Sequence, residues 1–312
     1  MRHVTTRRVL AAAWLALTAA LVGACVPPDA GPPASTTSTT QPGSTVKTVT
    51  NATLEWTISR EADNGAFAPG EVNYWSAGQS DSTEATYVAT NGNATVLKRN
   101  ASGAYVPIGS EPAVSWANRN RDGAGNVVSA TNAYYLGQKV RYTNGTGSVD
   151  TATGVATIQW TGTFTVNFYG RYVPFWIVNP KLTVDANGKG VLTASLGGYA
   201  SSLENPDVRT PLPQADDVVL AELPDVYSSG SVATGFPSAL PNYLGTVVTT
   251  PAEAPQAPQS PTNAAYWGSW PQSFVDFQQH TGLGTYWYTS GGSSADAKKP
   301  QEPISVSYTL NP

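Results

Sequence analysis

Apolar and polar side chains alternate most clearly in the middle of this 312-residue chain. Between residues 155 and 169, apolar side chains recur at every second or fourth position, which predicts a half-buried strand. Residues 172–184 and 191–200 predict two more strands. The dipeptide Asn187-Gly188 lies between them and is a strong signal for a tight hairpin, because both residues tolerate positive φ angles. We therefore expect a three-stranded antiparallel meander.

Prolines and glycines interrupt or end the other patterned segments. Pro174 and Pro180 fall inside the second strand and predict an edge strand or a bulge, because proline cannot donate to a sheet ladder. One short helix is expected within 271–280, where Gly282 is suited to end it. Elsewhere, short apolar segments separated by Gly and Asn turns predict an all-β fold, an antiparallel β-sandwich with this helix near its C-terminus.

The first 24 residues have a different pattern, typical of a secretory signal peptide. An arginine-rich head precedes an apolar run over 9–22, and small residues lead to Cys25 in a lipobox-like arrangement. The run is shorter than the ~20 residues that a spanning helix needs. We expect Sec-type export and acylation of Cys25, which would anchor the chain to the outer face of the membrane. The pair Arg7-Arg8 leaves a twin-arginine route open, and free secretion with an incidental Cys25 is the alternative.

Composition then divides the exported chain into two parts. Residues 25–48 are rich in Pro, Ser and Thr and are expected to form a disordered tether, and 49–312 to form one domain. Of 17 basic and 21 acidic side chains, three basic ones (Arg2, Arg7 and Arg8) lie in the signal, so the mature chain has 14 basic residues and a net charge of −7. This balance argues against nucleic acid or an anionic membrane surface as a partner, leaving the lipid anchor as the membrane contact.

Few side chains are available for metal or nucleophile chemistry. Cys25 is the single cysteine, so no disulfide can form within the chain. His3 leaves with the signal and only His280 remains, which argues against His-based zinc sites, blue-copper sites and a serine triad. Acidic residues suited to glycoside hydrolysis are present, but no spacing selects a pair: Glu55, Glu61, Asp63, Glu71, Asp216 and Asp217. We expect no enzyme activity, and keep a glycan-acting enzyme as the least favoured alternative.

Aromatic side chains are the remaining candidates for binding. The chain has 9 Trp and 15 Tyr, clustered at 158–176 and 266–288. Most aromatic residues in β proteins fill the core. However, the run Tyr286-Trp287-Tyr288 precedes Gly291-Gly292, and residues 168–172 crowd an expected strand turn. Aromatic rings beside glycines can line a flat apolar slot for a macrocycle or a sugar face.

Two sequence blocks resemble a known family. The run from Gly145 to Ala194 (GTGSVDTATG…GKGVLTA) is similar to the central meander of the HtaA-type haem-uptake domain of actinobacteria. The stretch from Trp270 to Tyr308 (WPQSFVDFQQHTGLGTYWYTSGG…ISVSY) is similar to its closing helix, glycine loop and last strand, and LEWTISRE loosely matches its first strand. The resemblance covers roughly residues 50–310.

This resemblance implies a β-sandwich that binds haem through a tyrosine ligand supported by a histidine. A phenolate is a hard, anionic ligand for ferric iron. After Trp56, where the family has its tyrosine, this chain reads TISREADNGAF, and the family's Gly-His pair is Gly170-Arg171 or aligns with Tyr169. Candidate iron ligands are then Tyr169 and Tyr172, followed by Tyr74, with His280 the remaining option. Arg171 could pair with a propionate or lower the pKa of a nearby phenol.

The sequence leaves two main functional hypotheses open. The first is a cell-surface protein that binds haem, or another flat apolar ligand, and relays it along the cell envelope, where other envelope proteins would be its partners. The second is a non-haem structural or glycan-binding module that kept the sandwich and lost the haem ligand, because fold alone does not fix function.

Overall fold

The computed structural model describes residues 44–66, 71–202, 205, 207–291 and 294–311. The expected signal peptide and Cys25 lie outside these residues. The strands are β1 (Val46–Trp56), β2 (Tyr74–Ala77), β3 (Thr90–Asn91), β4 (Ala94–Arg99), β5 (Tyr105–Pro107), β6 (Gln138–Asp150), β7 (Ala156–Gln159), β8 (Thr163–Phe168), β9 (Val173–Val184), β10 (Gly190–Ala200), β11 (Thr210–Leu223), β12 (Gly235–Ala239) and β13 (Ile304–Ser307). The helix α1 (Gln272–Thr281) is the single α-helix of the described part.

Six short 3₁₀ helices also lie within the described residues. They are η1 (Glu61–Asp63), η2 (Glu84–Thr86), η3 (Pro112–Val114), η4 (Trp116–Asn118), η5 (Gly284–Trp287) and η6 (Asp296–Lys298). The predicted class, an antiparallel all-β fold with one helix near the C-terminus, is confirmed. Among the described residues, no helix has the length and apolar character that a membrane crossing requires.

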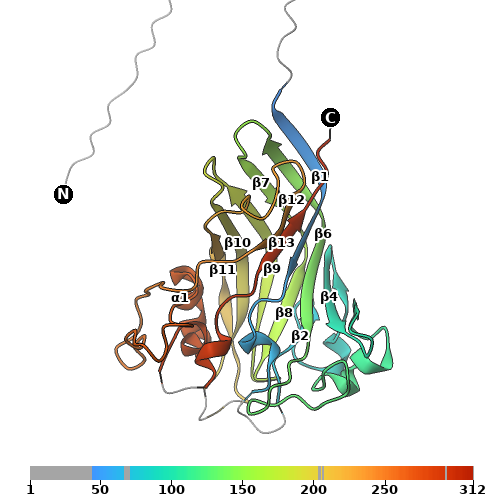
Figure 1. Cartoon of the computed structure of the whole chain (residues 1–312). Helices are drawn as coiled ribbons and strands as arrows, with labels where there is room; N and C mark the ends of the chain where they lie inside the picture. The colour runs from blue at the N-terminus through green and yellow to red at the C-terminus, as the bar shows by residue number, and fades with distance from the viewer. Residues whose placement is uncertain (1–43, 67–70, 203–204, 206, 292–293, 312) are drawn as a thin grey trace, which may run out of the picture. The chain divides into compact units, whose positions relative to one another are not determined.

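All described strands join one antiparallel sheet that divides at one end. Its main path runs β11-β10-β9-β7-β6-β1-β13-β12. The strand β7 lies between β6 and β9 over one half of their length only. Over the other half, β6 pairs with β4 and β9 pairs with β8, which in turn pairs with β2. The sheet therefore forks into a β4–β5 branch and a β8–β2 branch, both in the lower half of Figure 1.

The fork lies at a tight contact between two glycines. Gly92 and Gly162 form an isolated bridge, and the amide of Asn93 donates to the carbonyl of Thr161 (N···O 3.1 Å). A Cβ atom on Gly162 would come within 2.5 Å of the carbonyl oxygen of Asn91, and its φ angle is +127°. Only glycine satisfies both conditions. The single strand expected over 155–169 is therefore divided at this residue into β7 and β8.

The meander is confirmed, with one correction. The strand β9 is interior, because it pairs with β10 on one side and with β7 and β8 on the other, so the edge-strand option for its prolines is wrong. The bulge option is confirmed at Pro180, where the β9–β10 register shifts and Asn179 has a φ of +49°. The strand β1 begins at Val46, three residues before the domain boundary expected at 49, because its first residues pair with the end of β6.

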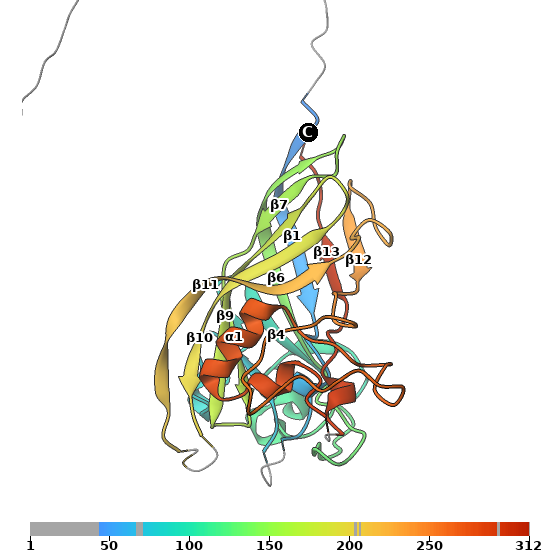
Figure 2. The ribbon, with the colours of Figure 1, turned by 90° about the vertical axis from the view of Figure 1, so that its left-hand side faces the viewer.

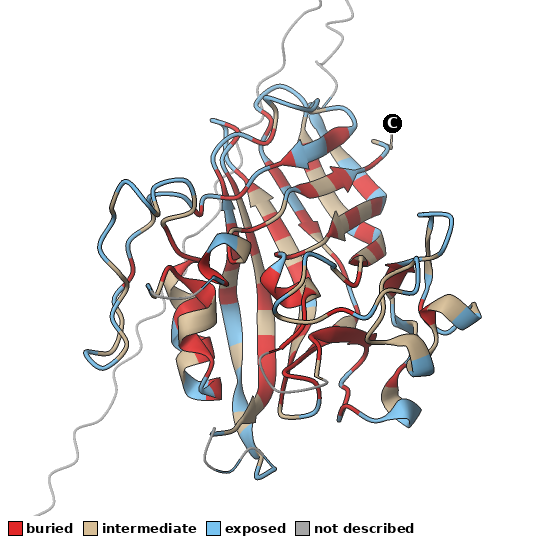
Figure 3. Ribbon diagram, turned by 60° about the horizontal axis from the view of Figure 1, so that its bottom comes forward, coloured by how far each residue is buried: buried red, intermediate tan, exposed pale blue. Residues whose placement is uncertain are grey.

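The helix α1 and the segments around it pack against one face of the sheet (Figures 1 and 2). The helix is buried along one face (Figure 3). Asp276 and His280 are exposed. The helix begins after Pro271, a residue tolerated at a helix start, and ends at Gly282 with a φ of +88°. Phe274 stacks on Trp270 (ring centroids 4.6 Å apart) and meets the edge of Trp287 at 4.8 Å. This aromatic cluster fixes the C-terminal segment on the sheet.

We predict that Phe274→Ala destabilises the domain by about 3–5 kcal/mol, because it removes a fully buried ring from a packed cluster. Urea unfolding followed by tryptophan fluorescence measures the change. Asp276→Asn, on the exposed side of the same helix, is the control and should stay within about 0.5 kcal/mol of the unmodified domain. A cost below about 1 kcal/mol for Phe274→Ala would contradict this packing.

Candidate functional site

Tyr169, the first candidate from the sequence, lies at a strained turn at the end of β8. Its φ angle is +53° and that of Gly170 is +64°, so two consecutive residues are left-handed. For a bulky residue such as tyrosine this conformation costs about 1–2 kcal/mol. The turn is held by hydrogen bonds from the Tyr169 amide to Asn73 Oδ1 (2.8 Å) and from the Gly170 amide to the carbonyl of Val72 (3.0 Å). This conformation brings the Tyr169 ring against the C-terminal segment.

The partner of Tyr169 is Tyr286 in η5, 117 residues later in the chain. Their hydroxyl groups form a short hydrogen bond, and their rings meet edge to face with centroids 5.5 Å apart. Phe168 contacts both rings, and Trp287 packs on Phe168 at 5.6 Å. Tyr169 is buried and Tyr286 half-buried. Burial first, and then the bond to Tyr169, raise the pKa of Tyr286, so this phenol is protonated at neutral pH.

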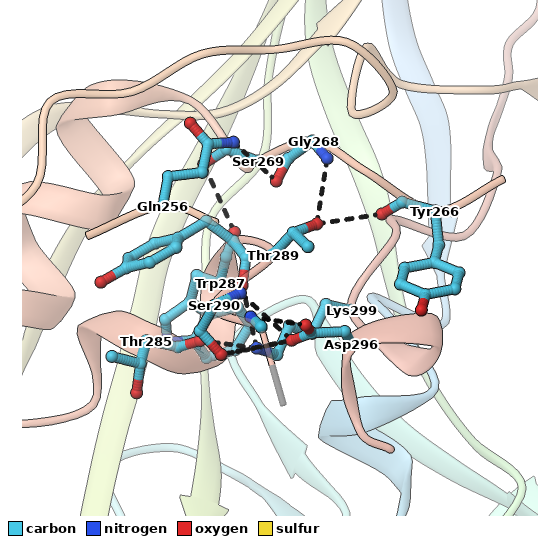
Figure 4. Close-up of polar contacts among 12 residues, drawn as sticks. Gln256, Tyr266, Gly268, Ser269, Thr285, Trp287, Thr289, Ser290, Asp296 and Lys299 are labelled. Atoms are coloured by element: carbon cyan, nitrogen blue, oxygen red, sulfur yellow. Dashed lines mark hydrogen bonds and ion pairs between the residues drawn. The ribbon is translucent and has the colours of Figure 1, made fainter. Parts of the chain in front are cut away.

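A buried lysine holds the loop that carries Tyr286 (Figure 4). Lys299 is 2% exposed. Its Nζ donates to the carbonyls of Thr285 (2.8 Å) and Tyr288 (2.9 Å), to Ser290 Oγ (3.0 Å) and to the Asp296 carboxylate. Two of these acceptors flank Tyr286 in the chain. The ammonium therefore fixes the backbone on both sides of the second phenol.

The Asp296 carboxylate extends this network into the glycine loop. It accepts hydrogen bonds from the amides of Ser290 (3.2 Å) and Gly291 (2.9 Å). Nearby, Thr289 Oγ1 donates to the carbonyl of Tyr266 and accepts from the amide of Gly268, at 3.1 Å each (Figure 4). Burial lowers the pKa of Lys299, while its ion pair with Asp296 opposes that shift. The segment after α1 is thus held by charge as well as by ring packing.

Nine buried side-chain polar atoms lack hydrogen-bond partners among the described residues, and three of them are Glu61 Oε2, Asn167 Nδ2 and Trp287 Nε1. Glu61 is 3% exposed in η1, and its charge acts on Tyr286. Burial raises the pKa of Glu61 to about 7, although the charges of two lysines lower it. Unpartnered buried polar groups are costly and uncommon in folded proteins. Glu61, whose charge acts on Tyr286, is therefore the unpartnered buried group that is tied to the phenol pair.

The other sequence candidates lie in different surroundings. Arg171 is exposed, forms an ion pair with Asp207 (3.0 Å) and stacks over the ring of Tyr172, which is half-buried. Tyr74 is fully buried in β2 and forms edge contacts with Tyr87 and Trp116. Burial raises the pKa of Tyr74 to about 12. Tyr74 therefore belongs to a separate aromatic cluster.

Sequence reasoning missed two residues of the site, Tyr286 and Glu61. The run Tyr286-Trp287-Tyr288 was noticed as the lining of a flat slot, but Phe168 and Trp287 are fully buried against each other and against Phe175. The signal that could have found Glu61 is its place in the segment after Trp56, where the resembling family has its tyrosine. The described residues hold no cluster of three or more His, Cys, Asp or Glu side chains able to bind a metal.

The donor chemistry of this site fits ferric iron, because phenol oxygens are hard ligands and two of them meet here. The shape of the site, unlike its donor chemistry, does not by itself accommodate haem. Three cavities lined by described residues have volumes of about 710, 460 and 310 Å³, and neither Tyr169 nor Tyr286 lines any of the three. The rings around the phenols are packed on each other, so a flat ligand needs movement of η5.

No family model and no curated protein matches this chain. Among solved structures, the chain is similar to the C-terminal domain of HtaA from Corynebacterium glutamicum, with 15% sequence identity and a TM-score of 0.41. The match covers 85% of this chain and 99% of that domain. The similarity concerns the fold, and no functional residue is transferred from it.

We predict that Glu61→Gln stabilises the domain at pH 8, by about 2 kcal/mol, and changes little at pH 5. The folded-state pKa of Glu61 (about 7) exceeds its ordinary value of 4.5, so the folded state holds the proton more tightly. The stabilising contribution of this group to the free energy of unfolding is fully present below pH 4.5. It is lost as the pH rises through about 7. Thermal unfolding between pH 5 and 8 measures it.

Glu55→Gln provides the contrast. Although burial alone raises the pKa of Glu55, its bonds with Lys139 and Arg141 hold that pKa below the usual value. Its stabilising effect is therefore present at neutral pH and lost as the medium becomes acidic. Removing Glu55 should lower the melting temperature at pH 7, and this loss should shrink toward pH 4. A similar pH trend for Glu55→Gln and Glu61→Gln would contradict these assignments.

We also predict that Lys299→Met costs about 3–5 kcal/mol, because it leaves the buried Asp296 carboxylate without its cation. The double variant Lys299→Met/Asp296→Asn should be less destabilised than the single variant, since no unpaired charge remains. Urea unfolding of both variants measures the difference. Equal or greater destabilisation of the double variant would show that the charge pair does not organise this loop.

Proposed function

We propose that this domain binds haem and that the paired phenols of Tyr169 and Tyr286 would hold the ferric iron. The observation that carries the proposal is the meeting of these two hydroxyls, and the buried, unpartnered Glu61 Oε2, whose charge acts on Tyr286, supports it. The HtaA-type resemblance in the sequence points to the same ligand. The residues at the pair differ from the family's tyrosine and histidine, so the proposal rests on this chain's own geometry.

Two adjacent phenols suit this role better than one. Burial raises the pKa of Tyr286 and keeps it protonated, because an isolated phenolate is costly in a low-dielectric site. A ferric haem supplies positive charge to which one phenolate can bind. The hydroxyl of the second tyrosine can donate a hydrogen bond to that phenolate and hold its orientation. In this arrangement the second phenol would support the tyrosine ligand, the role that a histidine has in the resembling family.

Guanidinium groups near the site offer partners for anionic substituents. Arg209 donates through Nη1 to the carbonyl of Arg171 (3.2 Å), which brings the two arginines together. The ion pair between Arg171 and Asp207 is exposed on both sides, and exposed pairs contribute little to stability. Exchanging Asp207 for a haem propionate would therefore cost little. This supports a ligand with carboxylates at its edge.

Haem binding at this site requires η5 to move away from β8, because Phe168 and Trp287 have no free face. That packing is the observation that favours the second candidate, a non-haem binding module of the cell envelope. Under either proposal, export and the lipid anchor at Cys25 would present the domain outside the cell, where it could relay its ligand to envelope partners.

Haemin titration of the domain spanning residues 44–312, followed by the Soret band, tests the proposal. We expect a phenolate-ligated ferric spectrum and saturation at one haem per domain. Tyr286→Phe should weaken binding at least tenfold and remove the phenolate charge-transfer band, and Tyr169→Phe should weaken binding and shift that band. Tyr227→Phe, which removes a half-buried phenol whose hydroxyl donates to the Gly154 carbonyl (2.7 Å), should change neither.

The opposite results favour the second candidate. An unchanged haem spectrum in the presence of the domain removes the proposal. The same is true if Tyr286→Phe and Tyr169→Phe both bind haem with the affinity and spectrum of the unmodified protein.

A further inference from the structure

The largest of the three cavities, about 710 Å³, lies on the other branch of the fork. It is lined by the segment after β1, the turn between β4 and β5, the turn at 122–124 and residues 133–138. Its volume falls in the range of about 300–1,000 Å³ that is typical of small-molecule sites. Tyr169, Tyr286 and Glu61 are not among its lining residues. It is therefore a separate place on the molecule.

Three tyrosines line this cavity. Tyr134 is 45% exposed, the only tyrosine among the exposed large apolar side chains of the described part. Tyr135 and Tyr105 are half-buried and lie under cationic groups, with Arg60 over Tyr135 (5.7 Å to the ring centroid). The ring of Tyr134 is thus an accessible flat surface, apolar on its face and polar at its hydroxyl.

Arg99 is the cationic side chain of the lining that has no ion pair in the described part of the chain. Its guanidinium carbon lies 4.7 Å from the centroid of the Tyr105 ring, and Lys139 Nζ lies 4.3 Å from the same centroid. Lys139 pairs with Glu55 (2.9 Å) and Arg60 with Glu302 (3.2 Å). Within the described residues, Arg99 forms no ion pair.

The acidic groups of the lining already have partners. Asp122 accepts from the amide and side chain of Asn126 (2.8 and 2.9 Å) within its own turn. Asp63 accepts from the amides of Gly137 and Gln138, at 2.9 Å each. Both carboxylates are therefore held by neutral amides, and neither forms an ion pair with Arg99 within the described residues. The guanidinium of Arg99, held on the Tyr105 ring, is the lining's cation without an ion pair, and a carboxylate is its best complement.

We propose that this cavity binds a short acidic saccharide, one that carries uronic-acid carboxylates. The carboxylate would pair with Arg99, and the apolar face of a sugar ring would lie on Tyr134. A saccharide matches a lining that combines exposed ring faces with hydroxyl, amide and backbone groups, because sugars present both apolar C–H faces and hydroxyls. An exported domain with few charges elsewhere would meet such polymers at the cell surface.

Isothermal titration with trigalacturonic acid and with its methyl ester tests this proposal on the domain spanning residues 44–312. We expect the acid to bind at least tenfold more tightly than the ester. Arg99→Gln should remove this preference, and Tyr134→Ala should weaken binding of both ligands about tenfold. Both side chains are exposed, so circular dichroism and melting temperature should be unchanged. Lys189→Gln, which removes an exposed positive charge on the β9–β10 hairpin, should bind like the unmodified domain.

Several results would overturn the proposal. These are no binding of trigalacturonic acid, an unchanged preference for the acid in Arg99→Gln, or equally tight binding of a tri-glutamate peptide, which would show attraction by charge alone. The two sites can also be told apart. Tyr286→Phe should keep saccharide binding, and Arg99→Gln should keep haem binding if the proposed function holds. Failure of one proposal therefore leaves the other intact.

Discussion

The buried ammonium of Lys299 is the constraint on which the C-terminal third of the structure depends. A charge removed from water is costly unless polar groups surround it. Here four acceptors do so, and they come from Thr285, Tyr288, Ser290 and Asp296. The backbone carbonyl of Lys299 in turn accepts the indole N–H of Trp270 (3.0 Å). One residue thus links the segment before the helix with the η5 loop and the glycine loop.

The forked sheet explains why the two candidate sites lie in different places on the molecule. Where β7 ends, β6 and β9 take different neighbours, and each branch carries its own loops. The β8 branch ends at the left-handed turn of Tyr169, against which the Lys299 loop places Tyr286. The β4–β5 branch carries Arg99 and the 710 Å³ cavity. The branches remain linked, because Asn73 Oδ1 accepts from the Tyr169 amide and the Asn73 carbonyl accepts from Gln138 Nε2, a side chain of the cavity lining.

Local sequence signals predicted the elements but not this branching. The Asn187-Gly188 turn and the alternation before it were sufficient for the meander, and Gly282 for the end of α1, because each feature depends on neighbours in the chain. The fork depends on which strand lies beside β6 and β9 at each level, and no local pattern contains that information. Pro174 and Pro180 suggested an edge or a bulge, whereas β9 is interior and accommodates Pro180 in its bulge.

The same limit applies to the site. Tyr169 was a candidate because it stands in an aromatic turn, yet its partner Tyr286 is 117 residues away and was not selected. Glu61 looked like one of several available acids, since its burial becomes apparent only when η1 packs beneath the C-terminal segment. Which side chains pair and which are buried depends on the tertiary structure. The sequence could therefore supply a list of candidate residues, and the three-dimensional arrangement was needed to choose among them.

Charge explains how an acidic domain can still attract anionic ligands. With a formal net charge of −4 for the whole chain, the average field repels long polyanions. A single cation can still attract a nearby anion, because salt screens the charges that lie farther away than the Debye length, about 8 Å at physiological salt. Arg99 on Tyr105, and Arg171 on Tyr172, are guanidinium groups whose orientation is set by the rings beneath them. Such fixed cations in an acidic surface select small ligands with one or two carboxylates and reject extended ones. The two proposed ligands, unlike in shape, share this property.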